Sequence, residues 1–245
     1  MSERSFHPNV EGFRSVADLY ERGRPEYPPE AIAVLGPAPG EVVLDLAAGT
    51  GKLTGALVDA GAAVIAVEPL PELRERISGA LRVVDGTAEA TGLEPHSVDH
   101  AAVGDAWHWF DHAAAAEELA RVVRPGGRVA LLSQDPRPED SPDWLQAAWS
   151  ALRRVRGDHP AFTDPGATRA PLERHPAFDG LAPHAVPFTW ITDRDTFLAL
   201  GASMSPVALL EEGRRADLLD EVGGYLPEGP FEVPYSTGVW TTLRS

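Results

Sequence analysis

The chain has 245 residues, enough for one α/β domain with a substantial buried core. Its formal net charge is −16, and no cluster of lysine or arginine offsets it, so we expect no nucleic-acid partner, which would need a basic face. The absence of cysteine excludes disulfides, thiolate metal sites and a cysteine nucleophile, and we expect no metal. Neither a signal peptide nor an apolar run near the ~18 residues of a membrane span is found. We therefore predict a cytoplasmic protein with no membrane partner.

The first forty residues are interpreted as a lid rather than as core. Residues 13–20 carry a modest helical pattern of apolar side chains. Three prolines between residues 25 and 29 then prevent a long helix, so Arg24 and Tyr27 should lie in an extended or turn segment.

Residues 41–54, EVVLDLAAGTGKLT, combine an apolar run typical of a buried parallel strand with a loop of small residues and the start of a helix. Gly49 and Gly51 permit a sharp turn and let a ligand approach the backbone closely. A dinucleotide fingerprint would need a third glycine, but Lys52 or Thr54 stands at that position. The spacing therefore disfavours a nicotinamide dinucleotide.

The order D-x-A-x-G-T-G resembles motif I of the class I S-adenosylmethionine-dependent methyltransferases, with an alanine in place of the usual first glycine. The resemblance implies that S-adenosylmethionine is the cofactor. A glycine turn that binds nothing is the alternative. The cofactor-binding residues implied here are Asp45, Ala47, Gly49, Thr50 and Gly51.

The run Y-x-x-x-R-P-x-Y-P, which starts at Tyr20, resembles the segment that precedes motif I in a subfamily of small-molecule methyltransferases that includes relatives of trans-aconitate methyltransferase. The resemblance implies that Tyr20 and Arg24 close over the cofactor, with Arg24 near its methionine carboxylate. A surface arginine and a packed tyrosine are the alternative.

A helix expected from Lys52 to Gly61 leads to a second buried strand, residues 63–67, which ends in Glu68 and Pro69. A carboxylate at the tip of this strand can accept hydrogen bonds from both hydroxyls of a ribose. The same acid would serve NAD or S-adenosylmethionine, so it supports a nucleoside without choosing the ligand. A favourable charge at a helix N-terminus is the alternative.

A third strand is expected at residues 81–84, followed by a loop that resembles the adenine-side loop of the same family. Thr87 and Ala88 match that loop by position. Whether Thr87, Asp85 or Glu89 supplies the side chain that meets the adenine is left open.

A fourth strand, residues 98–103, precedes the loop GDAWHWFD, which resembles the A-x-H-W-F-D form of motif IV in the same subfamily. Ligands of open α/β sheets lie beyond the carboxyl ends of the strands, so this loop should face the methyl group. His108 could act as general base, because its unperturbed pKa lies near working pH. Alternatively, the aromatic residues pack the core and His108 satisfies a backbone group. The implied residues are Asp105 and Ala106 for the cofactor, and Trp107, His108 and Trp109 for the substrate.

The remaining segments complete the predicted sheet. Met204 is expected either to line the pocket or to pack, and four arginines could meet an anionic substrate or solvent: Arg153, Arg154, Arg156 and Arg169. The expected elements are a helix at 113–123, a tight turn at 125–127, a strand at 128–132, an exposed loop at 134–143, a helix at 144–155, an irregular segment at 164–178, a strand at 183–192, helices at 195–200 and 206–222, and a β pattern at 231–243.

The resemblance covers nearly the whole chain. It implies an α/β fold, a Rossmann-like doubly wound seven-stranded sheet in the order 3-2-1-4-5-7-6 with the last strand antiparallel, helices on both faces and an insertion over the pocket. We expect one domain, residues 1–245, made of a lid (1–40), a cofactor-binding core (41–133), a substrate-side insertion (134–180) and C-terminal strands and helices (181–245).

The function implied is transfer of a methyl group from S-adenosylmethionine to a small-molecule acceptor. One alternative is a non-methylating descendant that binds the S-adenosyl nucleoside and acts in binding or another reaction. A nicotinamide-dependent oxidoreductase is the other. The sequence leaves the acceptor and the oligomeric state open.

Overall fold

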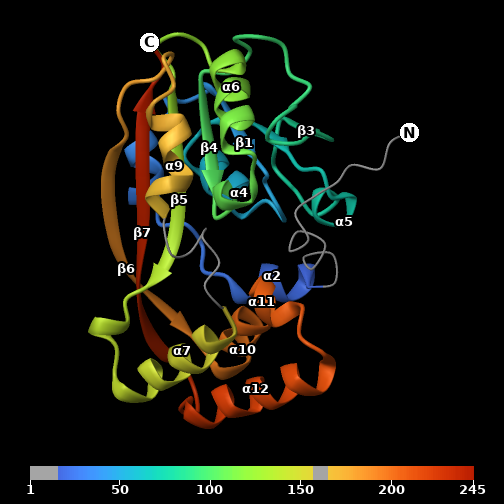
Figure 1. The fold of residues 1–245 in the computed structure, drawn as a ribbon, viewed down its shortest axis with the longest axis vertical. Helices are drawn as coiled ribbons and strands as arrows, with labels where there is room; N and C mark the ends of the chain where they lie inside the picture. Colours follow the sequence, from blue (N-terminus) through green and yellow to red (C-terminus); the bar gives the residue numbers. More distant parts are fainter. Residues whose placement is uncertain (1–15, 157–164) are drawn as a thin grey trace. The chain divides into compact units, whose positions relative to one another are not determined.

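The computed structural model describes residues 16–156 and 165–245. In this part of the chain the strands form a seven-stranded sheet in the order β3-β2-β1-β4-β5-β7-β6, which confirms the predicted order (Figure 1). Strands β3, β2, β1, β4 and β5 are parallel to their neighbours, and β7 is antiparallel. The strands are β1 (Val42–Leu46), β2 (Ala63–Val67), β3 (Arg82–Val84), β4 (His100–Gly104), β5 (Arg128–Pro136), β6 (Ala182–Thr192) and β7 (Phe231–Leu243).

Helices connect these strands, as expected for parallel pairs, which cannot be joined by tight turns. Those before β5 are α2 (Ala17–Gly23), α3 (Pro29–Leu35), α4 (Lys52–Asp59), α5 (Pro71–Arg74), the 3₁₀ helix η2 (Trp107–Trp109) and α6 (His112–Val122). Those after β5 are η3 (Pro138–Asp140), α7 (Asp143–Arg156), α9 (Pro165–Glu173), α10 (Arg194–Ser203), α11 (Ser205–Ala208) and α12 (Glu212–Tyr225).

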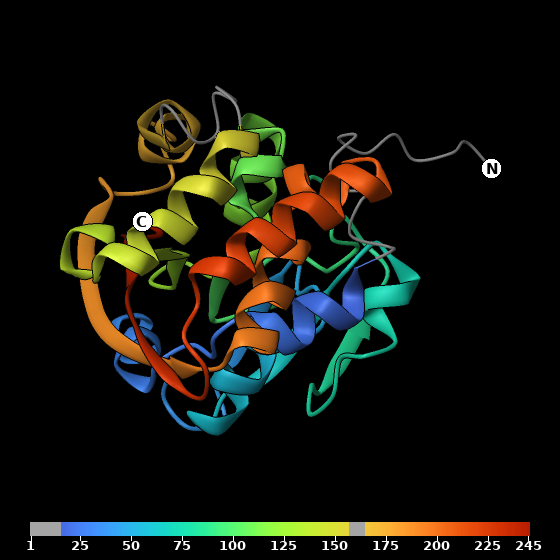
Figure 2. The same ribbon diagram turned by 90° about the horizontal axis from the view of Figure 1, so that it is seen from below.

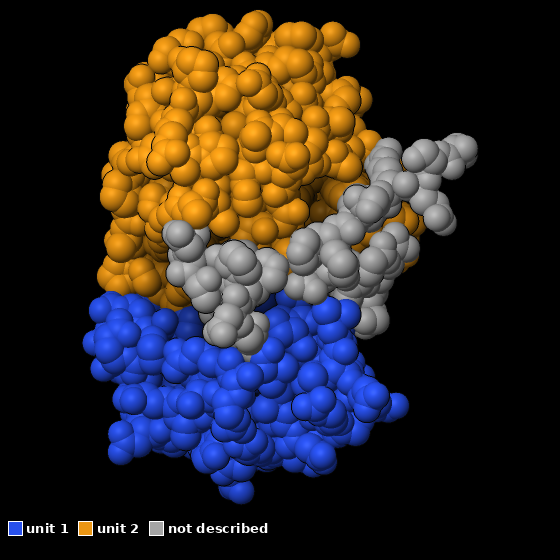
Figure 3. Space-filling view, viewed as in Figure 1, with its two compact units in different colours: residues 1–25, 136–159, 188–235 blue, residues 26–135, 160–187, 236–245 orange. Residues whose placement is uncertain are grey.

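The chain divides into two compact units, coloured separately in Figure 3. Unit 1 comprises residues 1–25, 136–159 and 188–235, and unit 2 comprises residues 26–135, 160–187 and 236–245. Each unit is therefore assembled from separate stretches of the chain, whereas the sequence suggested four contiguous parts of one domain. Strands β6 and β7 contribute residues to both units.

Unit 2 contains the parallel part of the sheet, whose two faces are buried in two separate apolar clusters. Side chains alternate between the faces, as the two-residue period of a strand requires. Leu44 and Val103 face the cluster that includes Leu119 of α6 and Leu172 of α9. Val43, on the other face, belongs to the cluster of α3 and α4. Burial on both faces explains why these strands are continuous apolar runs.

Unit 1 has an apolar core of its own, rich in aromatic rings. Helices α7, α10 and α12 pack around it, and α2 lies along α10 (Figure 2). The ring of Phe197 makes edge contacts with Trp149, at a centroid distance of 4.9 Å. Gly23 of α2 permits the closest approach, because an added Cβ would lie 2.3 Å from the backbone nitrogen of Leu200. A side chain at residue 23 would therefore separate α2 from α10.

Two segments differ from the sequence prediction. The proline- and glycine-rich run expected to be irregular contains α9, which begins at Pro165 and tolerates Pro171 near its end. A proline at the first helical position loses no hydrogen bond, and burial of Leu172 in the core stabilises the short helix. The helix expected at 206–222 is divided into α11 and α12, because Glu211 has extended backbone (φ −55°, ψ 144°). Gly213, two residues after the break, is only a weak local signal, because an isolated glycine is also tolerated inside a helix.

The segment interpreted as a lid also contributes to the core. Residues 29–35 form α3, which buries Ala31, Ile32 and Leu35 in unit 2. A helical pattern was expected at 13–20, and α2 begins at Ala17; residues 13–15 lie outside the described part of the chain. Arg24 is extended (φ −88°, ψ 136°), as the prolines predicted. None of the described helices combines the length and apolar character needed to cross a bilayer.

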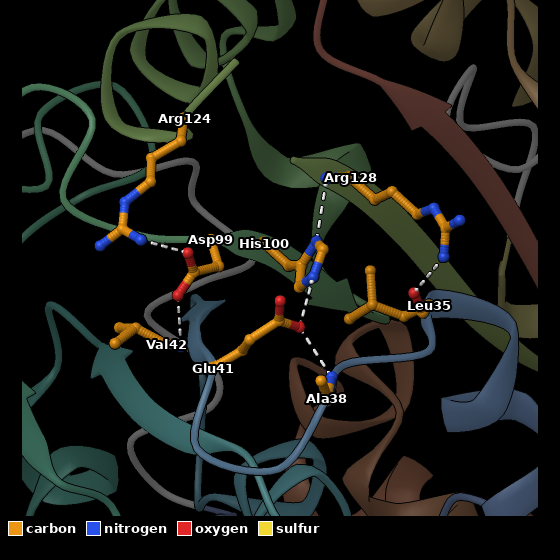
Figure 4. Close-up of polar contacts among 8 residues, drawn as sticks. All are labelled: Leu35, Ala38, Glu41, Val42, Asp99, His100, Arg124 and Arg128. Atoms are coloured by element: carbon orange, nitrogen blue, oxygen red, sulfur yellow. Dashed lines mark hydrogen bonds and ion pairs between the residues drawn. The ribbon is translucent and has the colours of Figure 1, made fainter. Parts of the chain in front are cut away.

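At the amino ends of β1 and β4, His100 bridges two segments of the backbone (Figure 4). Its Nδ1 accepts the backbone N–H of Arg128 at 3.0 Å, so the proton of the neutral ring sits on Nε2 and is donated to Glu41 Oε2 at 3.0 Å. Glu41 also accepts the backbone N–H of Ala38 at 2.7 Å. The hydrogen bonds from Ala38 and His100 hold the pKa of Glu41 below its ordinary value.

Replacing His100 with alanine is expected to lower the free energy of unfolding by roughly 1 kcal/mol, the lower end of the cost of leaving a backbone donor without its acceptor, because the bond from Arg128 is partly buried. The measurement is urea unfolding at neutral pH, compared with His184→Ala, which removes an exposed histidine of β6. Equal stability of the two variants would contradict a bridging role for His100.

Candidate functional site

The loop between β1 and α4 turns through three residues with left-handed backbone. These are Ala47 (φ 58°), Gly49 (φ 59°) and Gly51 (φ 93°). At Gly51 an added Cβ would lie 3.3 Å from Cα of Ile77, whereas at Gly49 it would meet no described atom within 4 Å. The loop is therefore packed at Gly51 and open at Gly49, the side from which a ligand can approach the backbone.

Glu68, directly after β2, is fixed against this loop. Its carboxylate accepts the backbone N–H of Gly49 through Oε2 and that of Leu70 through Oε1, each at 2.9 Å. Only 4% of the residue is exposed. Burial raises the pKa of Glu68 to about 7, and the nearby carboxyl of Asp45 adds to this rise, while the two backbone bonds oppose it. Each carboxylate oxygen keeps a second lone pair that a ligand hydroxyl could use.

Asp45 lies inside the same edge of the sheet, with 1% of its surface exposed. Thr54, in the first turn of α4, donates its hydroxyl to Oδ2 at 2.6 Å, whereas Oδ1 is buried with no hydrogen-bond partner among the described residues. Burial raises the pKa of Asp45 to about 7. The buried hydroxyl of Thr50 also has no hydrogen-bond partner in this part of the chain. Two polar groups beside the glycine loop are thus available to a ligand.

The loop after β3 is connected to the loop after β4. Thr87 and Ala90 form an isolated antiparallel β-bridge within the loop, and Ala88 is buried against the core. Glu89 Oε1 accepts the backbone N–H of Asp111 at 3.0 Å. Asp111 itself caps α6, where its carboxylate accepts two backbone N–H groups. The hydrogen bond from the backbone of Asp111 to the carboxylate of Glu89 therefore connects the two loops.

The loop after β4 begins with another left-handed residue, Asp105 (φ 49°), and continues into η2. Trp107 is 7% exposed and donates its indole N–H to the carbonyl of Thr168 in α9 at 2.9 Å. Its ring makes an edge contact with Phe110, at a centroid distance of 5.6 Å. The rings of His108 and Trp109 lie 4.3 Å apart and are partly exposed. Trp107 thus attaches the loop to α9, while the next two side chains remain accessible.

Strands β3, β2, β1 and β4 are adjacent and parallel, so the loops that follow them lie at one edge of the sheet. The structure brings most of the predicted site residues together there. Contact of each with a ligand stays a prediction. The residues are Asp45, Ala47, Gly49, Thr50, Gly51, Glu68, Pro69, Thr87, Ala88, Asp105, Ala106, Trp107, His108 and Trp109.

Three other predicted site residues belong to unit 1, and their proposed ligand contacts stay predictions. The guanidinium of Arg24 lies over the ring of Tyr20, 5.1 Å from its centroid. Met204, between α10 and α11, packs partly buried against the core of unit 1.

The arginines considered for an anionic substrate differ in their surroundings. Arg154 is paired with the carboxylate of Glu221, at 2.6 Å. Arg169 lies over the ring of Trp240, 4.2 Å from its centroid. Arg153 is exposed on α7, and Arg156 is the last residue of that helix. Arg154 thus already has an acidic partner, so it is a weaker candidate for an anion.

Three residues at this edge were not assigned by the sequence analysis. Thr54 lies one turn into α4, where a hydroxyl can reach back to the preceding strand, but spacing alone does not distinguish it from a core residue. Tyr27 was visible in the R-P-x-Y-P run. Gln134 carried no local signal. The phenol of Tyr27 donates to Asp105 Oδ2 at 3.2 Å, and the backbone N–H of Gln134 donates to Oδ1 at 3.0 Å.

Comparison with known proteins finds similar methyltransferases. Residues 44–131 match the family model described as a methyltransferase domain. The chain is 53% identical over 123 residues to an uncharacterised methyltransferase of Mycobacterium tuberculosis, covering 49% of this chain and 51% of that protein. It is 33% identical over 150 residues to an uncharacterised methyltransferase of Schizosaccharomyces pombe, covering 58% and 59%. The match thus spans about half the length of the mycobacterial relative.

Solved structures agree over a greater length. A type II methyltransferase structure from Anaeromyxobacter dehalogenans is similar with a TM-score of 0.67 and 27% identity, covering 89% of this chain and 97% of that one. A phosphoethanolamine N-methyltransferase of Haemonchus contortus, solved with S-adenosylhomocysteine, has a TM-score of 0.60 at 12% identity, covering 98% of this chain and 60% of that one. The second likeness concerns the fold alone.

The sheet order, the domain match and these relatives agree: the chain has the fold of the class I S-adenosylmethionine-dependent methyltransferases, and residues 44–131 match a methyltransferase domain. The methyltransferase domain proper corresponds to residues 44–131, from β1 into β5. The residues present fit the family's cofactor. Gly49 leaves open space beside the backbone, and the buried oxygens of Asp45 and Thr50 have no hydrogen-bond partner in the described chain.

Proposed function

We propose that this protein transfers a methyl group from S-adenosylmethionine to a small-molecule acceptor. The observation that carries the proposal is the junction of Glu68 with Gly49, where a buried carboxylate at the tip of β2 holds the open glycine loop at 2.9 Å. A ribose diol requires an acceptor of this kind. No observation on the described chain favours a nicotinamide enzyme or a non-methylating descendant.

The roles of the residues follow from their chemistry. Bound at this edge, S-adenosylmethionine would supply an electrophilic methyl group on a sulfonium sulfur. Glu68 would accept hydrogen bonds from the ribose hydroxyls, and the backbone of Gly49 would allow close approach. The aromatic side chains after β4 would exclude water and position the acceptor, and positioning of this kind can lower the barrier by ~7 kcal/mol or more.

The acceptor's lone pair would form the new bond to the methyl carbon while the carbon–sulfur pair returns to sulfur, leaving S-adenosylhomocysteine. An oxygen or nitrogen acceptor must also lose its proton. His108, in the loop after β4, would take that proton. The proposal of a small acceptor is supported by the net charge of −16, which opposes binding to a phosphate backbone.

The first test is calorimetric titration of the purified protein with S-adenosylmethionine, S-adenosylhomocysteine and NAD in parallel. We expect micromolar binding of the two sulfur nucleosides and none of NAD. Binding of NAD alone, or of none of the three, would overturn the proposed function. Methyl transfer to a library of small carboxylates, phenols and amines would then identify the acceptor.

If His108 is the general base, His108→Ala should lower turnover about 100-fold, the scale of a general-base contribution, with little change in cofactor affinity. His184→Ala, which removes an exposed histidine of β6, serves as the control. Unchanged turnover of His108→Ala would remove this residue from the mechanism.

A further inference from the structure

Four residues at the carboxyl ends of β4 and β5 form a closed ring of hydrogen bonds within unit 2. The phenol of Tyr27 donates to Asp105 Oδ2 at 3.2 Å. The backbone N–H of Gln134 donates to Asp105 Oδ1 at 3.0 Å, and its side-chain amide donates to the carbonyl of Glu26 at 3.0 Å. Glu26 and Tyr27 are consecutive, which closes the ring. The segment before α3, the end of β5 and the loop after β4 are thereby connected.

The residue at the centre of the ring is strained. Asp105 has φ 49°, a left-handed conformation that few non-glycine residues adopt, although aspartate tolerates it better than most. Its backbone N–H still donates to the carbonyl of Leu132 at 2.9 Å, so the sheet ladder continues while the chain turns. Both carboxylate oxygens are engaged. The ring therefore fixes the direction in which the loop carrying His108 leaves the sheet.

Tyr27 reaches Asp105 only because Gly104, the residue before Asp105, has no side chain. A Cβ added to Gly104 would lie 2.5 Å from the phenol oxygen of Tyr27. Tyr27 is 8% exposed, and its ring packs in the same apolar cluster as Leu53 of α4. A phenylalanine would fill this apolar space equally well. The hydroxyl is thus the part of Tyr27 that packing does not require.

The ring also reaches the glycine loop. The carboxylate of Glu26 pairs with the ammonium of Lys52, the first residue of α4 and the neighbour of Gly51. The side chain of Lys52 is 13% exposed, and that of Glu26 is 74% exposed. One short segment, residues 26–27, therefore contacts both the loop after β4 and the start of α4.

From these contacts we propose that Tyr27 is a positioning residue, which acts through Asp105 to set the loop of residues 105–111 for cofactor binding and methyl transfer. The expected effect on cofactor binding rests on the proposed function. The expected effect on the order of the loop rests only on the ring of hydrogen bonds. A purely structural tyrosine would contribute to folding stability without changing the order of this loop.

The test uses Tyr27→Phe, which removes the hydroxyl and keeps the aromatic side chain. The matched control is Tyr225→Phe, which removes another tyrosine-to-carboxylate hydrogen bond, to Glu221 on the exposed surface of α12. Hydrogen exchange of peptides covering residues 104–111 is measured without ligand. We expect the bonded amides of Trp109 and Phe110 to exchange about tenfold faster in Tyr27→Phe and at the wild-type rate in Tyr225→Phe.

The same variants are titrated with S-adenosylhomocysteine. Tyr27→Phe should bind about tenfold more weakly, the scale of one hydrogen bond to a charged acceptor, and Tyr225→Phe should bind as wild type does. In the background Asp105→Ala, which removes both carboxylate oxygens, adding Tyr27→Phe should cause no further loss, because Tyr27 acts through Asp105. If the two residues contributed independently, their separate losses of affinity would multiply in the double variant.

The outcomes separate the two ideas. Unchanged exchange at residues 104–111 overturns the positioning role, as does multiplication of the two losses in the double variant. A lower melting temperature with unchanged exchange and unchanged affinity would make Tyr27 structural and likewise overturn the inference. If the wild type binds no sulfur nucleoside while Tyr27→Phe still loosens the loop, the proposed function fails and the positioning of the loop by Tyr27 stands.

Discussion

A Glu68→Ala variant is expected to bind S-adenosylhomocysteine more weakly by roughly 1 to 3 kcal/mol, about a tenfold to hundredfold rise in the dissociation constant. The carboxylate would be lost as an acceptor for the ribose hydroxyls, and the backbone N–H groups of Gly49 and Leu70 would each lose the carboxylate oxygen to which they donate at 2.9 Å. The glycine loop would then be less well ordered when the ligand arrives. Calorimetric titration measures both effects together.

The titration is best made above pH 8. Burial raises the pKa of Glu68 to about 7, so the free protein carries the ionised, stronger acceptor only above that value. Glu72→Ala is the matched control, since it removes an exposed glutamate four residues away, on α5. Glu68→Gln, which keeps the size and one oxygen acceptor, should lie between wild type and Glu68→Ala. Wild-type affinity in Glu68→Ala would mean that the ribose is held elsewhere.

The second large effect concerns the pH dependence of stability. Burial raises the pKa of Asp45 from 3.8 to about 7, so the folded protein holds this proton more tightly than the unfolded chain. The stability that Asp45 contributes is complete below about pH 4 and is lost as the pH rises through 7. The loss amounts to as much as about 4 kcal/mol, from roughly three pKa units at 1.36 kcal/mol each.

Replacing Asp45 with asparagine removes this proton without removing the acceptor for Thr54. We therefore expect the free energy of unfolding to fall less between pH 4 and pH 7 in Asp45→Asn than in the wild type. Urea unfolding across this range gives the difference, and Asp59→Asn, at the exposed end of α4, is the control. Parallel pH profiles of wild type and Asp45→Asn would show that the Asp45 carboxyl is not held neutral in the fold.

The comparison of variants is needed because other acidic residues make the free energy of unfolding rise, not fall, as the pH increases. Burial raises the pKa of Glu118, but hydrogen bonds from Arg121 and Thr91 outweigh burial and leave it below the ordinary value. That contribution is present above about pH 4.5 and is lost as the pH falls. It is common to wild type and Asp45→Asn, so it cancels in the difference.

Strands β1 and β2 were predictable because each is short, mostly apolar and bounded by turn residues. The runs at residues 42–46 and 63–67 were located to the residue, and Gly49 and Gly51 were placed in the loop between the first strand and its helix. The α9 helix was missed because its proline and glycine content favours a loop, whereas burial of Leu172 in the core favours the helix. The break at Glu211 was missed because no local residue requires it.

The sequence by itself located the first parallel strands and the glycine loop, because strand periodicity and glycine spacing are local properties read along the chain. The class of fold and the order of the strands were implied by the resemblance of its motifs to a known family, and the structure confirms that order. Only the tertiary structure decided what surrounds the polar side chains at that edge. It placed Asp45 against Thr54, Glu68 against Gly49, and Tyr27 against Asp105, across separations of 9, 19 and 78 residues. Such contacts depend on the packing of distant segments, and the pKa values of Asp45 and Glu68 depend on the resulting burial, which no local pattern encodes.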